Sequence, residues 1–200
     1  NKSVDMIVMQ TSEGPFLATD NLCLRPLKMS DAPQITALLQ TPEISAMTET
    51  IPYPYHVEKA EEFISERICP GRSGPAGPLA VESENELIGI VDLSADTRDC
   101  DDGNPVLGFW VGRPYWGRGV ATEAVGAMIH VHFAHRGIDR IRSRVPETNG
   151  ASLKVHQKMG FRHAETVAGP VGQPATRHFT LDPDDFGFDP GWHGLRYLWR

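Results

Sequence analysis

Short stretches in which apolar residues alternate with polar ones, or follow one another directly, recur along the chain and predict a sheet. The segment 22–26 alternates in this way and stops at Pro26, which is typical of a short strand. The apolar run from Leu107 to Val111 predicts a buried strand. Further strands are expected at 79–82, 87–93, 138–145, 161–167 and 177–181, with a polar turn at 83–86.

Apolar residues at helical spacing lie between these strands. The first predicted helix is capped by Ser30 or Asp31 and ends at Thr41, because Pro42 follows. The order of elements is strand, two helices, three strands, helix, strand, helix and two strands, which indicates a mixed α/β fold around one sheet. The other helices are expected at 57–68, 121–135 and 149–159, and the one at 121–135 is expected to bury a single face with Ala124, Ala127, Met128 and Val131.

Composition narrows the class of protein. The 200 residues are 40% hydrophobic and 22% charged, which suits one packed domain. The formal net charge of -7 argues against nucleic acid as a partner, because phosphate binding needs clustered cations. No apolar stretch is long enough for a bilayer, and the basic start and long apolar run of a signal peptide are missing. No membrane partner and a cytoplasmic location are therefore expected.

No metal site is expected either. The three cysteines are scattered singly at 23, 69 and 100, without the spacing of a thiolate site or of a disulfide framework. Three histidines at 130, 132 and 135 fall on one predicted helix, where residues two apart face different directions. The acidic loop 96–105 lacks the regular ligand spacing of a calcium loop.

The segment 112–124 carries the clearest chemical signal. It joins the predicted strand 107–111 to a helix through Gly117 and Gly119, which allow a tight turn and the close approach of a ligand. The free N–H groups at the start of a helix, together with its dipole, favour an anion such as a pyrophosphate. Neither the Walker A pattern nor G-x-G-x-x-G is present. Glycines that only turn the corner of the chain would look the same.

The letters of this segment also resemble a known family. Tyr-Trp-Gly-Arg-Gly-Val-Ala-Thr-Glu-Ala at 115–124 is similar to motif A of the GNAT superfamily, the Gcn5-related N-acetyltransferases, in the branch that includes the ribosomal-protein N-terminal acetyltransferases. The segments 149–161 and 22–26 resemble a later motif and the opening strand of the same family. Pro114 stands where the family has Gln or Arg, and Arg113 precedes it. The phosphate contacts come from the backbone, so this departure leaves them intact.

The resemblance spans about residues 20 to 181 and implies a single domain at 21–181, with a central, mostly antiparallel, twisted sheet flanked by helices. Residues 1–20 are then an N-terminal extension, and the aromatic tail 182–200 has no assigned role. The resemblance implies acetyl-CoA as co-substrate. The implied contacts with it are Val111, Arg113, Gly117, Arg118, Gly119, Val120, Ala121, Thr122, Asn149 and Ser152.

The family's chemistry is direct transfer, in which an amine attacks the thioester in a ternary complex. The backbone N–H of Val111 is the implied oxyanion donor, and Ser152 is the implied proton donor to the departing thiolate. Asn149 is equally well explained as the N-cap of its helix. The base that deprotonates the amine stays open among Glu165, Glu82, Asp92 and His56.

Tyr53, Tyr55 and His56 lie in the proline-rich segment that overhangs the acceptor pocket in this family, although packing of that segment explains them too. The expected acceptor is a primary amine, either a protein N-terminus or a small molecule. The alternative is a non-catalytic module that binds acetyl-CoA and regulates a partner. A monomer and a homodimer are both compatible with the sequence.

Overall fold

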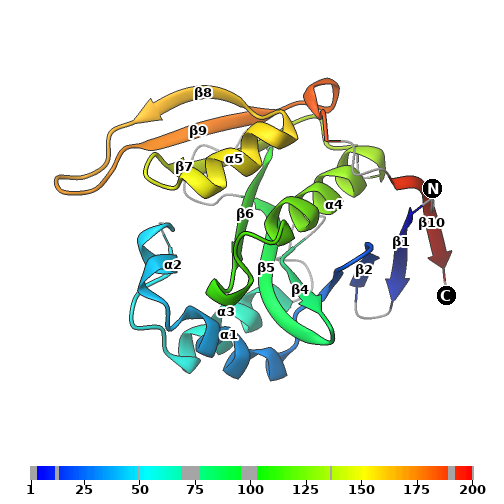
Figure 1. Cartoon of the computed structure of the whole chain (residues 1–200), viewed down its shortest axis with the longest axis horizontal. Helices are drawn as coiled ribbons and strands as arrows, with labels where there is room; N and C mark the ends of the chain where they lie inside the picture. The colour runs from blue at the N-terminus through cyan, green and yellow to red at the C-terminus, as the bar shows by residue number, and fades with distance from the viewer. Residues whose placement is uncertain are drawn as a thin grey trace.

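Ten strands form one sheet in the computed structural model, which describes residues 4–11, 14–48, 50–68, 77–95, 103–135, 137–188 and 192–199. The strand order is β10-β1-β2-β3-β4-β5-β6-β7-β9-β8 (Figure 1). All neighbours are antiparallel except the pairs β1–β10 and β6–β7, so the predicted mixed, mostly antiparallel sheet is confirmed. The strands are β1 (Val4–Thr11), β2 (Gly14–Ala18), β3 (Cys23–Pro26), β4 (Leu79–Ser83), β5 (Glu86–Ala95), β6 (Pro105–Val111), β7 (Ile141–Pro146), β8 (Arg162–Val167), β9 (Thr176–Leu181) and β10 (Trp192–Trp199).

Helices cover both faces of this sheet (Figure 1). On one face α1 (Ala32–Leu39) and α3 (Val57–Ile68) pack together over Ala80 and Ile90. On the other face α4 (Val120–His135) and α5 (Gly150–Met159) pack over Val91 and Leu93. Each face therefore has its own hydrophobic core, and the sheet separates the two.

The first predicted helix ends before Thr41 and Pro42, as expected, because α1 stops at Leu39 with Gln40 as its C-cap. Pro42 then opens a further short helix that was not predicted, α2 (Pro42–Ala46), in which it occupies the first turn. Proline is well suited to that position because its missing N–H has no partner there in any case. The segment after α2 lies close to the site described below.

The expectation of a single buried face on the helix 121–135 was too narrow. In α4 every side chain from Ala124 to Ile129 is buried. The tail explains this, because a Cβ placed on Gly126 would come within 2.3 Å of the Phe188 ring. Phe186 also packs against the same core. The side of α4 that faces away from the sheet is thus covered by the chain itself.

Segments without a predicted element at the two ends of the chain form strands. β10 pairs with β1 in parallel, from Val4 opposite Trp192 to Gln10 opposite Trp199, and β1 continues into β2. Cys69, Cys100 and the acidic loop residues 96–102 lie outside the described residues. Among the described helices, none is long and apolar enough to cross a bilayer.

The sheet is weakly joined at one place. β6 and β7 pair only at Val106 with Arg142 and at Leu107 with Ser143. Beyond these pairs, the rest of β7 continues along β9 instead of β6. The edge of β6 from Gly108 to Val111 therefore faces an opening in the sheet.

Candidate active site

Two cavities lie on either side of this opening. The first, called here the α4 cavity, has a volume of about 320 Å³ and is lined by Val111, the turn at Gly117 and Gly119, and the start of α4. The second, the α3 cavity, has a volume of about 550 Å³ and lies on the side of α1 and α3. Residues that line both cavities mark the place where they meet: Met47, Thr48, Phe109, Trp110, Asn149 and Ser152.

The glycine turn forms one wall of the α4 cavity. Gly117 and Gly119 have φ of +76° and +83°, a left-handed conformation in which a side chain is strained. A Cβ placed on either glycine would meet no other atom within 4 Å, so there is open space beside the backbone. The first turn of α4 begins here, since the Glu123 amide donates to the Gly119 carbonyl at 3.0 Å. This arrangement suits an anion at the start of the helix.

The backbone of β6 presents N–H groups to the opening. The amide of Gly112 donates to the carbonyl of Ile88 on β5 at 2.8 Å. Hydrogen bonding alternates along an antiparallel pair, so the N–H groups of Phe109 and Val111 point the other way, toward the opening. The Val111 carbonyl, which shares this direction, accepts from the Trp116 indole at 2.6 Å. The expected placement of the Val111 N–H is consistent with this register, and Phe109 is a donor that the sequence did not suggest.

The start of α5 closes the junction of the cavities. Asn149 caps the helix, because its Oδ1 accepts from the Ser152 amide at 3.0 Å. Its Nδ2 donates to the carbonyl of Met47 at 3.0 Å. The side chain therefore holds two parts of the wall together. Ser152 is half-buried and lines both cavities, and its hydroxyl lies 3.5 Å from His156 Nδ1.

Comparison with known proteins decides the family. The model of the acetyltransferase (GNAT) domain matches residues 21–162. The chain belongs to the GNAT family. Two curated relatives are an uncharacterized N-acetyltransferase p20 of Bacillus licheniformis, 27% identical over 73% of this chain and 82% of its own length, and the SPbeta prophage-derived uncharacterized N-acetyltransferase YokL of Bacillus subtilis (strain 168), 26% identical over 71% and 76%.

Solved structures show the same fold at low sequence identity. RimL, a ribosomal L7/L12 alpha-N-protein acetyltransferase in complex with coenzyme A, matches with a TM-score of 0.71 at 18% identity, over 84% of this chain and 97% of its own. Mycobacterium smegmatis RimJ in complex with CoA-disulfide matches with a TM-score of 0.72 at 18% identity, over 94% and 90%. This GNAT protein is thus an acetyl-CoA-dependent acyltransferase.

The arginines expected to contact the cofactor stand beside the turn of this acetyltransferase. Arg113 and Arg118 are exposed, and neither lines the α3 or the α4 cavity. The Arg113 guanidinium lies 4.9 Å from the centre of the Trp116 ring, and that of Arg118 lies 5.7 Å from the Tyr115 ring. Both rings line the α4 cavity, so two cations are held close to its wall.

The three residues expected around the acceptor are separated. Tyr55 is only 7% exposed and lines the α3 cavity, and burial raises the pKa of its hydroxyl. Tyr53 is 53% exposed and His56 is exposed, and neither lines the α3 or the α4 cavity. The structure therefore brings one of the three to the site.

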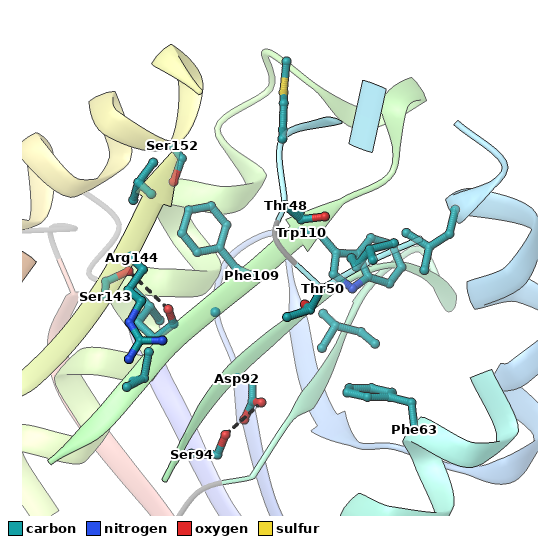
Figure 2. A pocket seen from close by; sticks show the side chains of 18 of the residues that line it. Thr48, Thr50, Phe63, Asp92, Ser94, Phe109, Trp110, Ser143, Arg144 and Ser152 are labelled. Atoms are coloured by element: carbon teal, nitrogen blue, oxygen red, sulfur yellow. Dashed lines mark hydrogen bonds between the residues drawn. The ribbon is translucent and has the colours of Figure 1, made fainter. Parts of the chain in front are cut away.

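Of the four candidates for the base, the structure places Asp92 in the α3 cavity (Figure 2). Glu82 is 2.7 Å from Arg25, in an ion pair between β3 and β4. Glu165 is exposed beside His178, at 3.2 Å. His56 stands just before α3 and outside the cavity walls.

A buried histidine lies behind the junction and was not predicted. His156 Nδ1 lies 2.8 Å from the Ser152 carbonyl, and Nε2 lies 2.8 Å from the Ser143 hydroxyl. Burial lowers the pKa of His156 to about 4, so the ring is neutral near pH 7. A carbonyl needs a donor, so the ring proton is on Nδ1 and Nε2 is left as an acceptor. The single proton of the Ser143 hydroxyl has two acceptors within reach, Nε2 at 2.8 Å and the Leu107 carbonyl at 3.2 Å. The spacing from Ser152 to His156 is four residues, which is the one sequence signal for this contact.

The described residues contain no group of three or more His, Cys, Asp or Glu side chains arranged to hold a metal.

Proposed function

We propose that this acetyltransferase transfers the acetyl group of acetyl-CoA to a primary amine, which attacks the thioester directly while both substrates are bound. The observation that carries the proposal is the meeting of two cavities at the open edge of β6. Acetyl-CoA occupies the α4 cavity, and the amine approaches from the α3 cavity. Neither substrate then has to leave before the other binds.

The glycine turn receives the pyrophosphate of acetyl-CoA. The N–H groups from Gly117 to Thr122 and the positive end of the α4 dipole supply the attraction. The open space beside both glycines leaves room for a phosphate. Arg118 adds positive charge at the same wall, whereas the charge of Arg113 is paired with Glu43 at 3.9 Å.

Backbone and side-chain groups of the protein at the junction of the two cavities then promote transfer of the acetyl group. Acetyl-CoA supplies a thioester carbonyl that is activated toward amines. The N–H groups of Phe109 and Val111 face the opening and stabilise the negative oxygen that forms on attack. The Ser152 hydroxyl, which borders both cavities, donates a proton to the departing sulfur.

The proposal of an amine acceptor is supported by the size of the α3 cavity and by the acceptors that the structural relatives are named for. RimL is an alpha-N-protein acetyltransferase of ribosomal L7/L12, so its acceptor belongs to a protein. A spermidine N-acetyltransferase chimera from Vibrio cholerae and hSSAT also matches this chain, with a TM-score of 0.68 at 17% identity. A protein and a polyamine are acceptors of very different size, and both offer an amine. A cavity of about 550 Å³ holds the end of a peptide or a small polyamine.

A panel of acceptors tests the proposal. Release of coenzyme A thiol is measured with peptides that carry a free α-amino group, with spermidine and with ethylamine. We expect thiol release that depends on one or more of these amines. If acetyl-CoA binds and none of the amines increases thiol release, amine acetylation is excluded as the activity.

A pair of glycine variants tests the cofactor site separately. Gly119→Ala and Gly137→Ala both place a methyl group on a left-handed residue in open space. They are separated by α4, whose 16 residues span about 24 Å. We expect a similar loss of stability, about 1 kcal/mol, in both. Only Gly119→Ala should weaken acetyl-CoA binding, by at least about tenfold in calorimetry; equal affinity in the two variants would place the pyrophosphate elsewhere.

A further inference from the structure

Asp92 occupies an unusual position on the wall of the α3 cavity. It lies on β5 directly opposite Gly108 of β6, with its carboxylate at the cavity and its side chain 17% exposed (Figure 2). Oδ2 accepts from Arg67 at 2.9 Å and from Ser94 at 3.0 Å. Oδ1 is buried and has no hydrogen-bond partner among the described residues. A carboxylate that is only partly satisfied is poorly stabilised as an anion.

Burial accordingly raises the pKa of Asp92, and its contacts with Arg67, Ser94 and the Leu93 backbone only partly oppose this effect. A carboxylate with a raised pKa binds a proton more readily, which is the property that a general base needs. The raised pKa does not by itself assign a role, since ion pairs inside structural networks are perturbed as well. The position of Asp92 relative to the open edge of β6 supplies the second argument.

The pairing register of β5 and β6 places the Asp92 carboxylate beside the edge of β6 at which the thioester carbonyl is expected to bind. Asp92 and Gly108 form a hydrogen-bonded pair, with Cα atoms about 5.5 Å apart. A Cβ placed on Gly108 would meet nothing within 4 Å, so the space next to Asp92 is open. Phe109, whose N–H faces the opening, is the next residue, about 3.3 Å further along the strand. An amine beside Asp92 is therefore close enough to reach a thioester at this edge, either directly or with one water between them.

The other titratable groups of the cavity suit this task less well. Glu62 is exposed and bound to Lys59 at 2.7 Å. The His156 ring is committed at both nitrogens, and its pKa is lowered rather than raised. β6 itself has no titratable side chain. The charged and titratable groups that surround Asp92 are Tyr55 before α3, Lys59, Glu62, Glu66 and Arg67 on α3, Arg144 on β7 and His156 on α5.

We propose that Asp92 is the base of this active site: its carboxylate receives the ammonium group of the acceptor and takes the proton that the amine must lose before it attacks. This inference rests on the proposed function and names the residue that carries one of its steps. The proton moves from R–NH₃⁺ to Asp92, which becomes neutral. The nitrogen then forms a bond to the carbonyl carbon, and the carbon–sulfur bond breaks.

The remaining protons balance without a further reactant. The nitrogen loses its second proton as the tetrahedral intermediate collapses, and the leaving sulfur gains one and departs as coenzyme A thiol. Asp92 returns its proton to solvent when the product leaves. The overall change is R–NH₃⁺ plus acetyl-CoA to the amide, coenzyme A and one H⁺.

Asp92→Asn tests this role, because it keeps the shape of the side chain and removes the base. The probe is the amine of the panel that the wild-type chain acetylates fastest, at saturating acetyl-CoA. At pH 7 we expect kcat/KM for the amine to fall by about a hundredfold or more. Acetyl-CoA affinity, measured by calorimetry, should change less than twofold, since the glycine turn lies on the other side of the opening.

The pH profile separates a base from a structural residue. In Asp92→Asn only the neutral amine reacts, so log kcat/KM should rise with a slope of one up to the pKa of the amine itself. In the wild type the profile should level off at lower pH. Glu61→Gln is the matched control, since it removes one negative charge from the exposed face of α3, outside both cavities, and leaves β5 untouched; it should retain both the rate and the profile.

The outcomes separate this inference from the proposed function. A wild-type chain that acetylates no panel amine overturns the proposed function, and the role of Asp92 with it. An active wild type, with Asp92→Asn equally active and with the same pH profile, overturns the role of Asp92 alone. A parallel loss in Asp92→Asn and Glu61→Gln also overturns it, because the effect would then come from the net charge of the protein.

Discussion

His156 is held as a neutral ring inside the protein. The side chain is 1% exposed and lies between the rings of Phe161 and Phe179, with centroid distances of 4.7 and 5.2 Å. Both nitrogens are hydrogen-bonded, one to the backbone of α5 and one to Ser143 on β7. The ring thus ties α5, with the Ser152 hydroxyl at its start, to the strand that borders the opening.

This arrangement predicts how stability depends on pH. The pKa of His156 is about 4 in the folded chain and about 6.5 in the unfolded chain, so below pH 6.5 the unfolded state binds the proton first. The contribution is complete above pH 6.5 and is lost as the pH falls toward 4. We expect a loss of up to about 3 kcal/mol over this range.

Chemical denaturation at several pH values checks this expectation. His156→Gln keeps the ability to hydrogen-bond and cannot titrate, so its stability should be lower at pH 7 and should vary less between pH 6.5 and 4. His56→Gln, at an exposed position just before α3, is the control for the removal of a histidine as such. Identical pH dependence in His156→Gln and the wild type would show that the ring does not resist protonation.

At the scale of elements, Asn149 links the start of α5 to the chain that follows α2. Asn149→Ala removes the cap and should cost about 1 kcal/mol. Asn149→Asp keeps the capping oxygen, and its negative charge suits the helix start, but it loses the amide donor to the Met47 carbonyl. We therefore expect Asn149→Asp to retain stability in thermal denaturation and to show faster amide hydrogen exchange around 47–48. Equal exchange in Asn149→Asp and the wild type would mean that this contact does not hold the segment.

The elements that the sequence predicted well carry their own local signals. α3 begins and ends where its apolar spacing predicts, and the turn of Gly117 and Gly119 joins β6 to α4 as expected. α2 was missed because a proline that ends one helix is equally suited to begin the next. β1 and β10 depend on each other, although they are more than 180 residues apart in sequence, so no local pattern reveals them.

Pairing register limited the prediction of the site. Which N–H groups of β6 face the opening follows from the contact between Gly112 and Ile88, which the sequence does not contain. The hydrogen bond between Ser143 and His156 likewise joins a strand to a helix, so no local sequence pattern predicts it. The glycine turn, Asn149 and Ser152, which the sequence singled out and which line the α4 cavity, lie in motifs where local structure and a cavity wall coincide; their roles stay predictions.

At the scale of the whole molecule, the sheet has two unequal parts. One contains β10, β1, β2, β3, β4, β5 and β6, and the other contains β7, β9 and β8. α4 contacts the larger part, and it also packs against α5, which lies over the smaller part (Figure 1). Both cavities lie where the two parts meet, so groups from both surround the same junction.

In mechanical terms, we expect the two residue pairs between β6 and β7 to act as a hinge between the two parts of the sheet, here called plates, and acetyl-CoA bound in the α4 cavity to act as a strut on the open side. A ligand at a hundred times its Kd adds about 2.7 kcal/mol to the folded state. If the plates flex about the hinge, this gain should appear mainly as slower amide exchange in β6, β7 and the start of α5, and much less in β2 and β3. Hydrogen exchange with and without acetyl-CoA, with ATP as the control ligand, measures the pattern. Uniform slowing throughout the chain would instead describe a rigid plate that has no working hinge.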